Sequence, residues 1–232
     1  MTPAGERDLA RRIRGRVRNI ERGIRAAGGL RPWIGYFPGP GPRLMSALRR
    51  RWVVWRNPQA HIEFRGPVYL GPRFSLDIPH GGTFIVGPGV EFRRGFRAEI
   101  ARGGRLVIGA GCHLTYDVVI ACSTSIEIGE RVSLAQATYV VDGNHRFRDW
   151  TRPFIEQGYD FRPVRIEDDV LVLTKCTIMN SIGTHSVVAA HAVVNRPIPP
   201  YCVAGGVPAR LIEYFGPPGE EPPELRAPAA ER

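Results

Sequence analysis

The segment from Asp142 to Trp150 carries a histidine, His145, in the run Asp-Gly-Asn-His. A neutral imidazole near pH 7 can take the proton of a hydroxyl group, and a positioned base typically contributes about 10² to 10⁴ in rate. Asp142 can orient that imidazole or contact a substrate, or it can cap the turn before Gly143. A lone loop histidine is more often an exposed bystander, so the interpretation depends on the chain around it.

The chain around this segment repeats with a period of six residues. Aliphatic anchors recur six apart in four blocks of three: Ile108, Leu114, Ile120; Ile128, Leu134, Val140; Ile166, Val172, Ile178; and Ile182, Val188, Val194. Small or branched residues stand four positions after many anchors: Cys112, Val118, Val132, Thr138, Val170, Cys176, Ser186 and Ala192. This period fits neither an α-helix nor a lone strand and is typical of a β-helix, a triangular coil of short strands.

The alternative to the coil is a β-sandwich, which predicts alternation within strands and turns every 8 to 12 residues or so. Corner residues at a constant distance from the anchors favour the coil. Glycines directly follow several anchors, where a residue without a side chain eases a tight corner: Gly87, Gly109, Gly129 and Gly183. An earlier, weaker run fits the same grid if His80 stands at an anchor: Val68, Phe74, Val86, Phe92 and Ala98.

The repeat is interrupted three times. The step from Ile120 to Ile128 gains two residues, and the step from Ile178 to Ile182 loses two. Between Val140 and Ile166 the chain leaves the coil in an excursion loop over residues 143–163, which contains His145. Because a long loop inside a compact repeat is usually functional, we expect the chemistry to lie there.

Four motifs between Tyr139 and Phe215 carry a family resemblance: residues 142–145, Gln157-Gly158-Tyr159 with the return at 163–170, residues 198–201, and residues 204–210. They resemble the Asp-His-Asn-His, Ile-Pro-Pro and Gly-Asn-Pro-Ala-Lys elements of hexapeptide-repeat acyltransferases. The resemblance is to the maltose, galactoside and xenobiotic acetyltransferase type, most closely the acetyltransferases found beside glycosyltransferases in exopolysaccharide pathways.

The resemblance implies an all-β, left-handed parallel β-helix that assembles as a homotrimer. It implies direct transfer of an acetyl or other short acyl group from coenzyme A, most readily acetyl-CoA, to a hydroxyl of a sugar or glycan, without a metal. His145 would be the general base, with Asp142 beside it. Contacts to coenzyme A would come from Thr174, Ala190, Asn195, Arg196 and Arg210. Arginine suits the nucleotide phosphates because its guanidinium binds them in a bidentate fork.

The sequence departs from the family on the donor side. Val170-Leu171-Val172-Leu173 stands where Val-Trp-Ile-Gly is usual, and Ala189-Ala190-His191-Ala192 stands where Gly-Ala-Gly-Ser is usual. An alternative function is therefore a catalytically impaired β-helix scaffold or interaction protein of a glycan-biosynthesis complex. A metal site is not expected, because His185 and His191 are six apart and so fall on adjacent faces of the coil.

The first 56 residues form a basic arm, with 14 arginines and no lysine against three acidic residues. An apolar stripe predicts an amphipathic helix: Leu9, Ile13, Val17, Ile20 and Ile24. Such a helix suits an anionic membrane surface, or it packs on a neighbouring subunit or a glycosyltransferase. Nucleic acid is not expected, since no recognised binding module is present. A second segment, Arg43 to Arg56, is expected to dock the arm on the coil.

The remaining features define the other boundaries. Residues 57–215 form the predicted β-helix domain, and the tail 216–232, rich in Pro, Glu and Ala, is expected to be disordered. Four cysteines without a pairing motif are expected to be reduced thiols. The sequence has neither an apolar span of membrane length nor the apolar run of a secretory signal, so we expect a cytoplasmic protein, peripheral on the inner membrane face if the arm binds lipid.

Overall fold

The structure is a computed structural model that describes residues 40–226. The predicted helix over residues 9–24 lies outside this range. From Ser46 onward the chain forms one compact unit. Its strands belong to three parallel sheets, which we name A, B and C, and a separate two-stranded hairpin.

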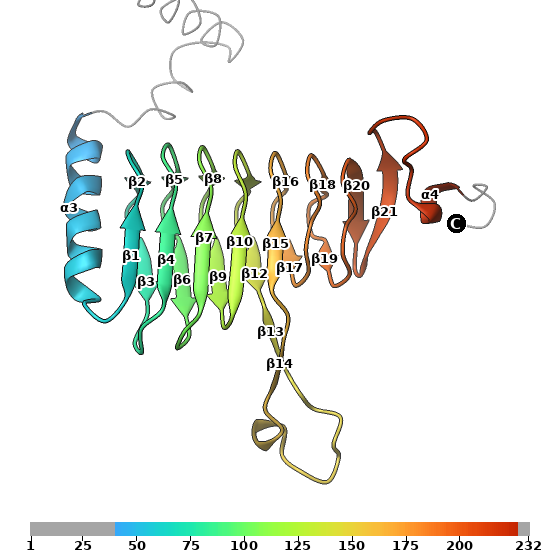
Figure 1. Cartoon of the computed structure of the whole chain (residues 1–232), viewed down its shortest axis with the longest axis horizontal. Coiled ribbons are helices and arrows are strands. Elements are labelled where there is room, and N and C mark those ends of the chain that lie inside the picture. The colour runs from blue at the N-terminus through green and yellow to red at the C-terminus, as the bar shows by residue number, and fades with distance from the viewer. Residues whose placement is uncertain (1–39, 227–232) are drawn as a thin grey trace, which may run out of the picture. The chain divides into compact units, whose positions relative to one another are not determined.

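Successive strands enter the three sheets in turn, and each pairs in parallel with the strand of the next coil (Figure 1). Sheet A contains β1 (His61–Phe64), β4 (Thr83–Val86), β7 (Arg105–Ile108), β10 (Ser125–Ile128) and β15 (Val164–Ile166). Sheet B contains β2 (Tyr69–Leu70), β5 (Glu91–Phe92), β8 (His113–Leu114), β11 (Ser133–Leu134), β16 (Leu171–Val172), β18 (Val187–Val188), β20 (Cys202–Gly206) and the antiparallel β21 (Ala209–Tyr214). Sheet C contains β3 (Ser75–Asp77), β6 (Arg97–Ile100), β9 (Val119–Cys122), β12 (Tyr139–Val141), β17 (Thr177–Ile178) and β19 (Val193–Val194). The predicted left-handed parallel β-helix is confirmed.

The interior of the coil is filled by the residues that the six-residue period predicted. Every anchor of the four blocks is buried, and so is every corner residue from Cys112 to Ala192. The polar corner residues are satisfied locally: Thr138 Oγ1 donates to the carbonyl of Ala135 at 2.7 Å, and Ser186 Oγ donates to the carbonyl of Pro199 at 2.7 Å. Stacked aliphatic side chains therefore form one continuous core.

The corners between sheets turn through the left-handed backbone region. Non-glycine residues there have φ near 60°, as at Asp117 (56°), Asp169 (60°) and His185 (60°). The glycines that follow anchors have a different role, since a Cβ on Gly109 would collide with the carbonyl group of Gly129 in the next coil. The prediction of tight corners at these glycines is confirmed, and its cause is the close approach of two backbones.

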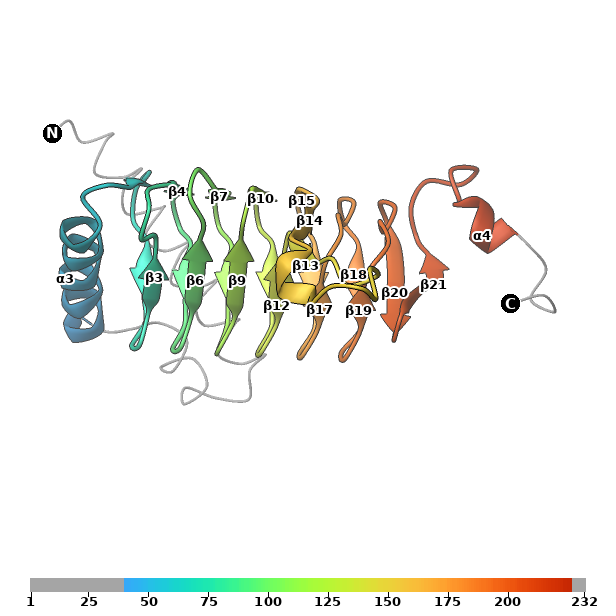
Figure 2. The same ribbon diagram turned by 90° about the horizontal axis from the view of Figure 1, so that it is seen from below.

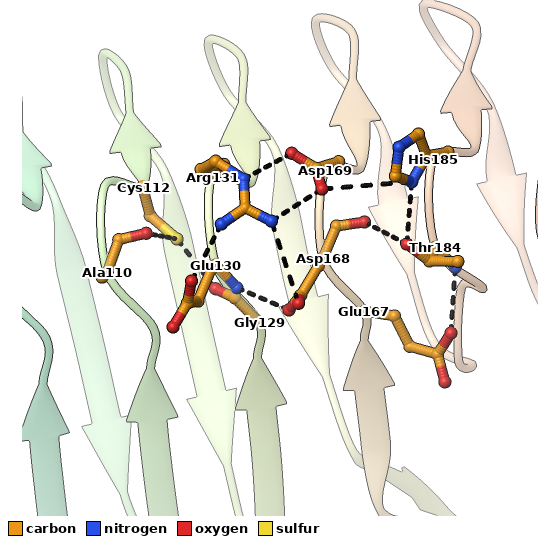
Figure 3. A network of polar contacts seen from close by, with 10 residues as sticks. All are labelled: Ala110, Cys112, Gly129, Glu130, Arg131, Glu167, Asp168, Asp169, Thr184 and His185. Carbon is orange, nitrogen blue, oxygen red and sulfur yellow. Dashed lines mark hydrogen bonds and ion pairs between the residues drawn. The ribbon is translucent and has the colours of Figure 1, made fainter.

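A ladder of polar contacts ties consecutive coils together at the corner between sheets A and B (Figure 3). Arg131 donates from Nε and Nη2 to the two carboxylate oxygens of Asp169, at 2.7 and 2.8 Å. This pairing holds the pKa of Asp169 below its usual range. Asp168 accepts the backbone N–H of Glu130 at 2.8 Å, and Thr184 Oγ1 donates to the carbonyl of Asp168 at 2.8 Å. The ladder fixes the register of the coils that carry the excursion loop.

The early coils are longer than the six-residue grid allows. Val86 pairs with Ile108, a step of 22 residues, whereas Ile166 pairs with Ile182, a step of 16. His80 is exposed, so placing it at an anchor position was wrong. The physical reason is that His80 lies in the turn between β3 and β4, which separates the buried residues Leu76 and Val86 by ten positions where the grid allows six.

From Ser46 onward, α3 (Pro40–Arg56) packs on the first turn of the coil. Ser46 and Val53 are buried there, and Ser46 Oγ accepts the backbone N–H of Leu70 at 2.8 Å. Arg49 donates to the carbonyl of Leu70 at 2.9 Å. The segment that we expected to dock on the coil therefore does so from Ser46 onward. No helix within residues 40–226 is long and apolar enough to cross a membrane.

The last coil continues into residues that we expected to be disordered. After β21, Tyr214 OH donates to the carbonyl of Pro217 at 3.1 Å, Pro222 is buried, and α4 (Pro223–Arg226) follows. Of the tail that we expected to be disordered from residue 216, the structure describes the part up to Arg226, in which Pro222 is buried. Residues 227–232 lie outside the described range.

Candidate active site at the excursion loop

The excursion loop is a hairpin that projects from the coil (Figures 1 and 2). After β12, strand β13 (Gly143–His145) pairs antiparallel with β14 (Tyr159–Phe161), which places His145 opposite Tyr159. The tip carries a short 3-10 helix, η1 (Phe154–Glu156). Gly143 has a steric role, since a Cβ there would lie 2.9 Å from the ring of Phe161.

His145 is exposed, and two aromatic rings hold its imidazole. The ring centroids of His145 and Tyr159 lie 4.3 Å apart, and Phe154 meets the imidazole edge-on at 5.5 Å. The antiparallel pairing supplies Tyr159, and the 3-10 helix supplies Phe154. The histidine is therefore accessible to a substrate while its orientation is restricted by packing.

Asp142 is buried at the base of the hairpin, and its carboxylate forms hydrogen bonds with the neighbouring coil. Its carboxylate accepts the backbone N–H groups of Ser123 at 2.6 Å, Thr124 at 2.7 Å and Ser125 at 2.8 Å, together with the Thr124 hydroxyl at 2.9 Å. Within residues 40–226 it makes no hydrogen bond to His145. Of the roles that the sequence left open, the geometry favours the capping role, although the capped turn is 123–125 and not the one at Gly143.

Gln157 fastens the two sides of the loop together. Its Oε1 accepts the backbone N–H of Asp149 at 3.0 Å, and its Nε2 donates to the carbonyls of Asp149 at 2.8 Å and Arg152 at 2.9 Å. Sequence reasoning assigned no role to this residue, although it stands in the Gln-Gly-Tyr motif. A buried amide with three local bonds gives the loop a defined conformation.

A hollow of about 670 Å³ lies between the loop and the outer face of sheet C, and we call it the loop hollow. The loop contributes Asp142, His145, Arg148, Asp160, Phe161 and Arg162 to its lining, and sheet C contributes Met179, Asn180, Val193 and Asn195. The predicted residues His145 and Asn195 therefore meet in one cavity. Asn180 is buried and donates to the carbonyl of Asn195 at 3.2 Å, which fixes that wall.

The other predicted donor contacts lie elsewhere. Thr174 and Ala190 occupy equivalent corners of consecutive coils, before β17 and β19, and the Thr174 carbonyl accepts the backbone N–H of His191 at 2.9 Å. The loop leaves from the opposite end of the same sheet, after β12. Arg196 is exposed directly after Asn195, and Arg210 is exposed on β21 of sheet B. Within a single chain, Thr174 therefore lies beside Ala190, and His145 shares a cavity with Asn195. The two pairs lie at separate places.

Sequence reasoning missed part of the lining of the hollow. Met179 directly follows the anchor Ile178, just as Asn195 follows Val194. Because side chains alternate across a strand, a residue after an inward anchor of sheet C faces outward, toward the loop. This rule could have found Met179, whereas the arginines of the loop carry no comparable signal.

The cysteines are unsuited to nucleophilic chemistry. All four are buried and free, and burial raises the pKa of Cys112 to about 11 and that of Cys122 to about 12. Because the thiolate is the nucleophilic form, these groups are inert near neutral pH. Within the part of the chain that the structure describes, no group of three or more His, Cys, Asp or Glu residues is placed to hold a metal ion.

No family model matches the chain. A probable acetyltransferase of Mycobacterium tuberculosis is 35% identical over 174 residues, which cover 72% of this chain and 57% of the relative. In its sequence and in its hexapeptide coil, the chain is similar to the hexapeptide-repeat acetyltransferases.

Two further comparisons add to the description of this hexapeptide-repeat protein. The galactoside O-acetyltransferase of Escherichia coli is 30% identical over 112 residues, covering 47% of this chain and 54% of the relative. A hexapeptide-repeat acetyltransferase of Vibrio cholerae, solved with acetyl coenzyme A, has a TM-score of 0.44 and 21% identity, with 73% of this chain and 78% of that chain covered. The hexapeptide-repeat chain spans little more than half the length of the curated relatives it matches.

Proposed function

We propose that this hexapeptide-repeat protein is a coenzyme-A-dependent O-acyltransferase that moves an acetyl or other short acyl group to a hydroxyl of a sugar or glycan. The observation that carries the proposal is the position of His145, exposed at the loop hollow and packed against Tyr159 at 4.3 Å. An exposed imidazole with a restricted orientation suits a general base.

In the proposed reaction, a ring nitrogen of His145 takes the proton of the acceptor hydroxyl as that oxygen attacks the thioester carbonyl. The carbon–sulfur bond then breaks, and the imidazolium returns the proton to the leaving thiolate of coenzyme A. Asn195 lines the same hollow and carries an amide donor that can hold the developing oxyanion. No cysteine is available as an intermediate nucleophile within residues 40–226, which supports direct transfer.

We assign the donor groove to the corner formed by Thr174 and Ala190. Leu171 and Leu173 are half-exposed beside it and offer an apolar wall for the pantetheine arm, while the exposed Arg196 and Arg210 can bind phosphates. This corner precedes the strands of sheet C, whereas the loop follows one of them, so the two lie at opposite ends of the strands. A homotrimer would bring the corner of one copy to the loop of the next, and we include it in the proposal for that reason.

The test is release of free coenzyme A from a panel of acyl-CoAs with a galactoside acceptor. His145→Ala should lower the rate by about 10²- to 10⁴-fold, and His80→Ala is the matched control because His80 is an exposed histidine between β3 and β4. Equal rates for the wild type and His145→Ala would exclude the catalytic assignment.

A second candidate function, a β-helix scaffold without catalysis, is favoured by one observation. The coil shortens to a step of 16 residues at Ile182, where sheet A is reduced to isolated bridges. A scaffold would show no thermal shift with coenzyme A. A clear shift in the melting temperature with acetyl-CoA would support the enzyme.

We further propose that the basic arm binds the inner face of an anionic membrane. Supporting this, α3 exposes Trp52 and Trp55, at 54% and 71%, with ring centroids 4.9 Å apart and Arg51 and Arg56 beside them. Each Arg near an anionic surface contributes about 1 kcal/mol. Deleting residues 1–30 should abolish sedimentation with anionic liposomes. Unchanged sedimentation would contradict the proposal and leave a subunit or a glycosyltransferase as the partner.

A further inference from the structure

We infer that the acceptor is a sugar carrying a phosphate or pyrophosphate group, bound by Arg148 and Arg162 on the two sides of the hairpin. The inference deepens the proposed function and rests on it. Arg148 stands beyond the end of β13, and Arg162 directly follows β14. Both line the loop hollow together with His145.

The acidic residues of the loop hollow are already paired. Both carboxylate oxygens of Asp142 are taken by the turn at residues 123–125. Asp160 accepts the Nε–H of Arg146 at 2.6 Å. Backbone N–H groups therefore stabilise the Asp142 carboxylate and Arg146 pairs with Asp160, so neither carboxylate is paired with Arg148 or Arg162.

The two arginines of the hollow, Arg148 and Arg162, differ from the other arginines of the loop in their ion pairs. Arg146 pairs with Asp160, and Arg152 pairs with Asp149 at 2.8 Å. Arg148 lies over the ring of Phe147 at 5.3 Å, and neither it nor Arg162 has a carboxylate partner within residues 40–226. The hollow therefore offers two guanidinium groups to an anion, and guanidinium forks match phosphate oxygens.

Phe161, which lines the hollow, and the neighbouring Tyr159 offer a surface for a sugar ring. Both side chains are exposed, and their rings stack with centroids 5.7 Å apart and an interplanar angle of 9°. An aromatic pair of this kind packs against the apolar face of a sugar. Because Tyr159 also contacts His145, a sugar on these rings has hydroxyl groups near the imidazole. The volume of about 670 Å³ is in the range of small-molecule sites.

Two sources share this chemistry: a soluble nucleoside diphosphate sugar and a sugar linked to a polyprenyl pyrophosphate. In both, a sugar ring lies next to a pyrophosphate. The two arginines would bind the pyrophosphate that both sources share, and a comparison of acceptors in the turnover test distinguishes the sources.

Binding is tested first, by calorimetry on the full chain with His145→Ala as the background, so that no turnover occurs. The probes are galactose 1-phosphate and the neutral methyl galactoside. We expect galactose 1-phosphate to bind about tenfold or more tightly than the neutral sugar, and each of Arg148→Gln and Arg162→Gln to remove most of that difference. Arg97→Gln is the matched control, since Arg97 is exposed on β6 of the same sheet, away from the loop.

Two binding results would overturn the inference. One is equal affinity for the charged and the neutral sugar. The other is a preference for the charged sugar that both glutamine variants retain. A melting-temperature measurement on each variant shows whether it is folded, and both are expected to fold because the replaced side chains are exposed.

Turnover is tested next, with acetyl-CoA and three acceptors: methyl galactoside, a nucleoside diphosphate galactose and a polyprenyl pyrophosphate-linked galactose. We expect kcat/KM to be at least tenfold higher for a pyrophosphate acceptor, with KM raised in the Arg148→Gln and Arg162→Gln variants. His145-dependent acylation of all three at equal kcat/KM would overturn the inference and leave the proposed function standing. Arginine-dependent binding without acyl transfer to any acceptor would overturn the proposed function and leave the anion site standing.

Discussion

The imidazole of His145 packs against the ring of Tyr159 across the two strands of the excursion hairpin, with centroids 4.3 Å apart. This contact restrains a histidine that is otherwise exposed. Replacing Tyr159 with alanine should lower kcat by about two- to tenfold, because an aromatic pair contributes about 0.5 to 1.5 kcal/mol. Tyr159→Phe keeps the ring and should retain the wild-type rate. A loss of activity in Tyr159→Phe would show that the hydroxyl, and not the ring, is what matters.

Asp142 should be required for stability more than for chemistry. Asp142→Ala leaves three backbone N–H groups of residues 123–125 without their acceptor, and it should lower the free energy of unfolding by about 2 to 4 kcal/mol in urea titrations. Asp160→Ala is the control, because its carboxylate is exposed, and should change stability by under about 0.5 kcal/mol. If Asp142→Ala unfolds like the wild type but is inactive, the carboxylate acts on the reaction directly.

Gln157 should control the opening of the loop. Without its three hydrogen bonds the tip is expected to open more often, so trypsin should cut Gln157→Ala after Arg146 or Arg148 about tenfold faster than the wild type. Urea unfolding of the coil should be unchanged. Gln136→Ala replaces an exposed glutamine on the coil and serves as the control. Equal digestion rates for Gln157→Ala and wild type would show that Gln157 does not fasten the loop.

The buried thiols should make the protein less stable at high pH. In the unfolded chain a thiol ionises near pH 9.0, whereas in the fold the pKa of Cys112 is about 11 and that of Cys122 about 12. Above pH 9 the unfolded state therefore binds fewer protons than the folded state, and the free energy of unfolding falls by about 1.4 kcal/mol per pH unit for each thiol. Below pH 9 this contribution is fully present.

The measurement is urea unfolding at several pH values between 9 and 11, with Cys122→Ala beside the wild type. The variant should show a shallower slope, by about 1.4 kcal/mol per pH unit, because the contribution of Cys122 is gone. Identical slopes would mean that Cys122 ionises in the fold as it does in the unfolded chain. Native protein should also resist iodoacetamide at pH 8.

The six-residue period was sufficient to predict the coil and its core. An anchor such as Ile120 or Val172 points inward because it belongs to a short strand, and the small residue four positions on must fill the corner. Both requirements are local, so they are visible in the sequence. The excursion over residues 143–163 was visible for the same reason, as an interruption of a regular pattern.

Local pattern failed where the length of a turn changed. His80 stands at a position that the grid assigned to the core, yet it is exposed because it lies in the turn between β3 and β4. A longer turn leaves the alternation within each strand unchanged, so the pattern alone does not fix how many residues separate one face from the next. The 22-residue spacing of the early coils appears only when Val86 pairs with Ile108.

The sequence by itself determined the coil, the likeness to a family and the presence of His145 in a loop. The tertiary structure decided which groups surround that histidine. Asp142 is three residues from His145 in the chain, but its hydrogen bonds go to residues 123–125. Asn195 is far away in the sequence, yet it lines the same hollow as His145. The physical reason is that coils stack by backbone pairing, so spatial neighbours are set by strand register and not by separation along the chain.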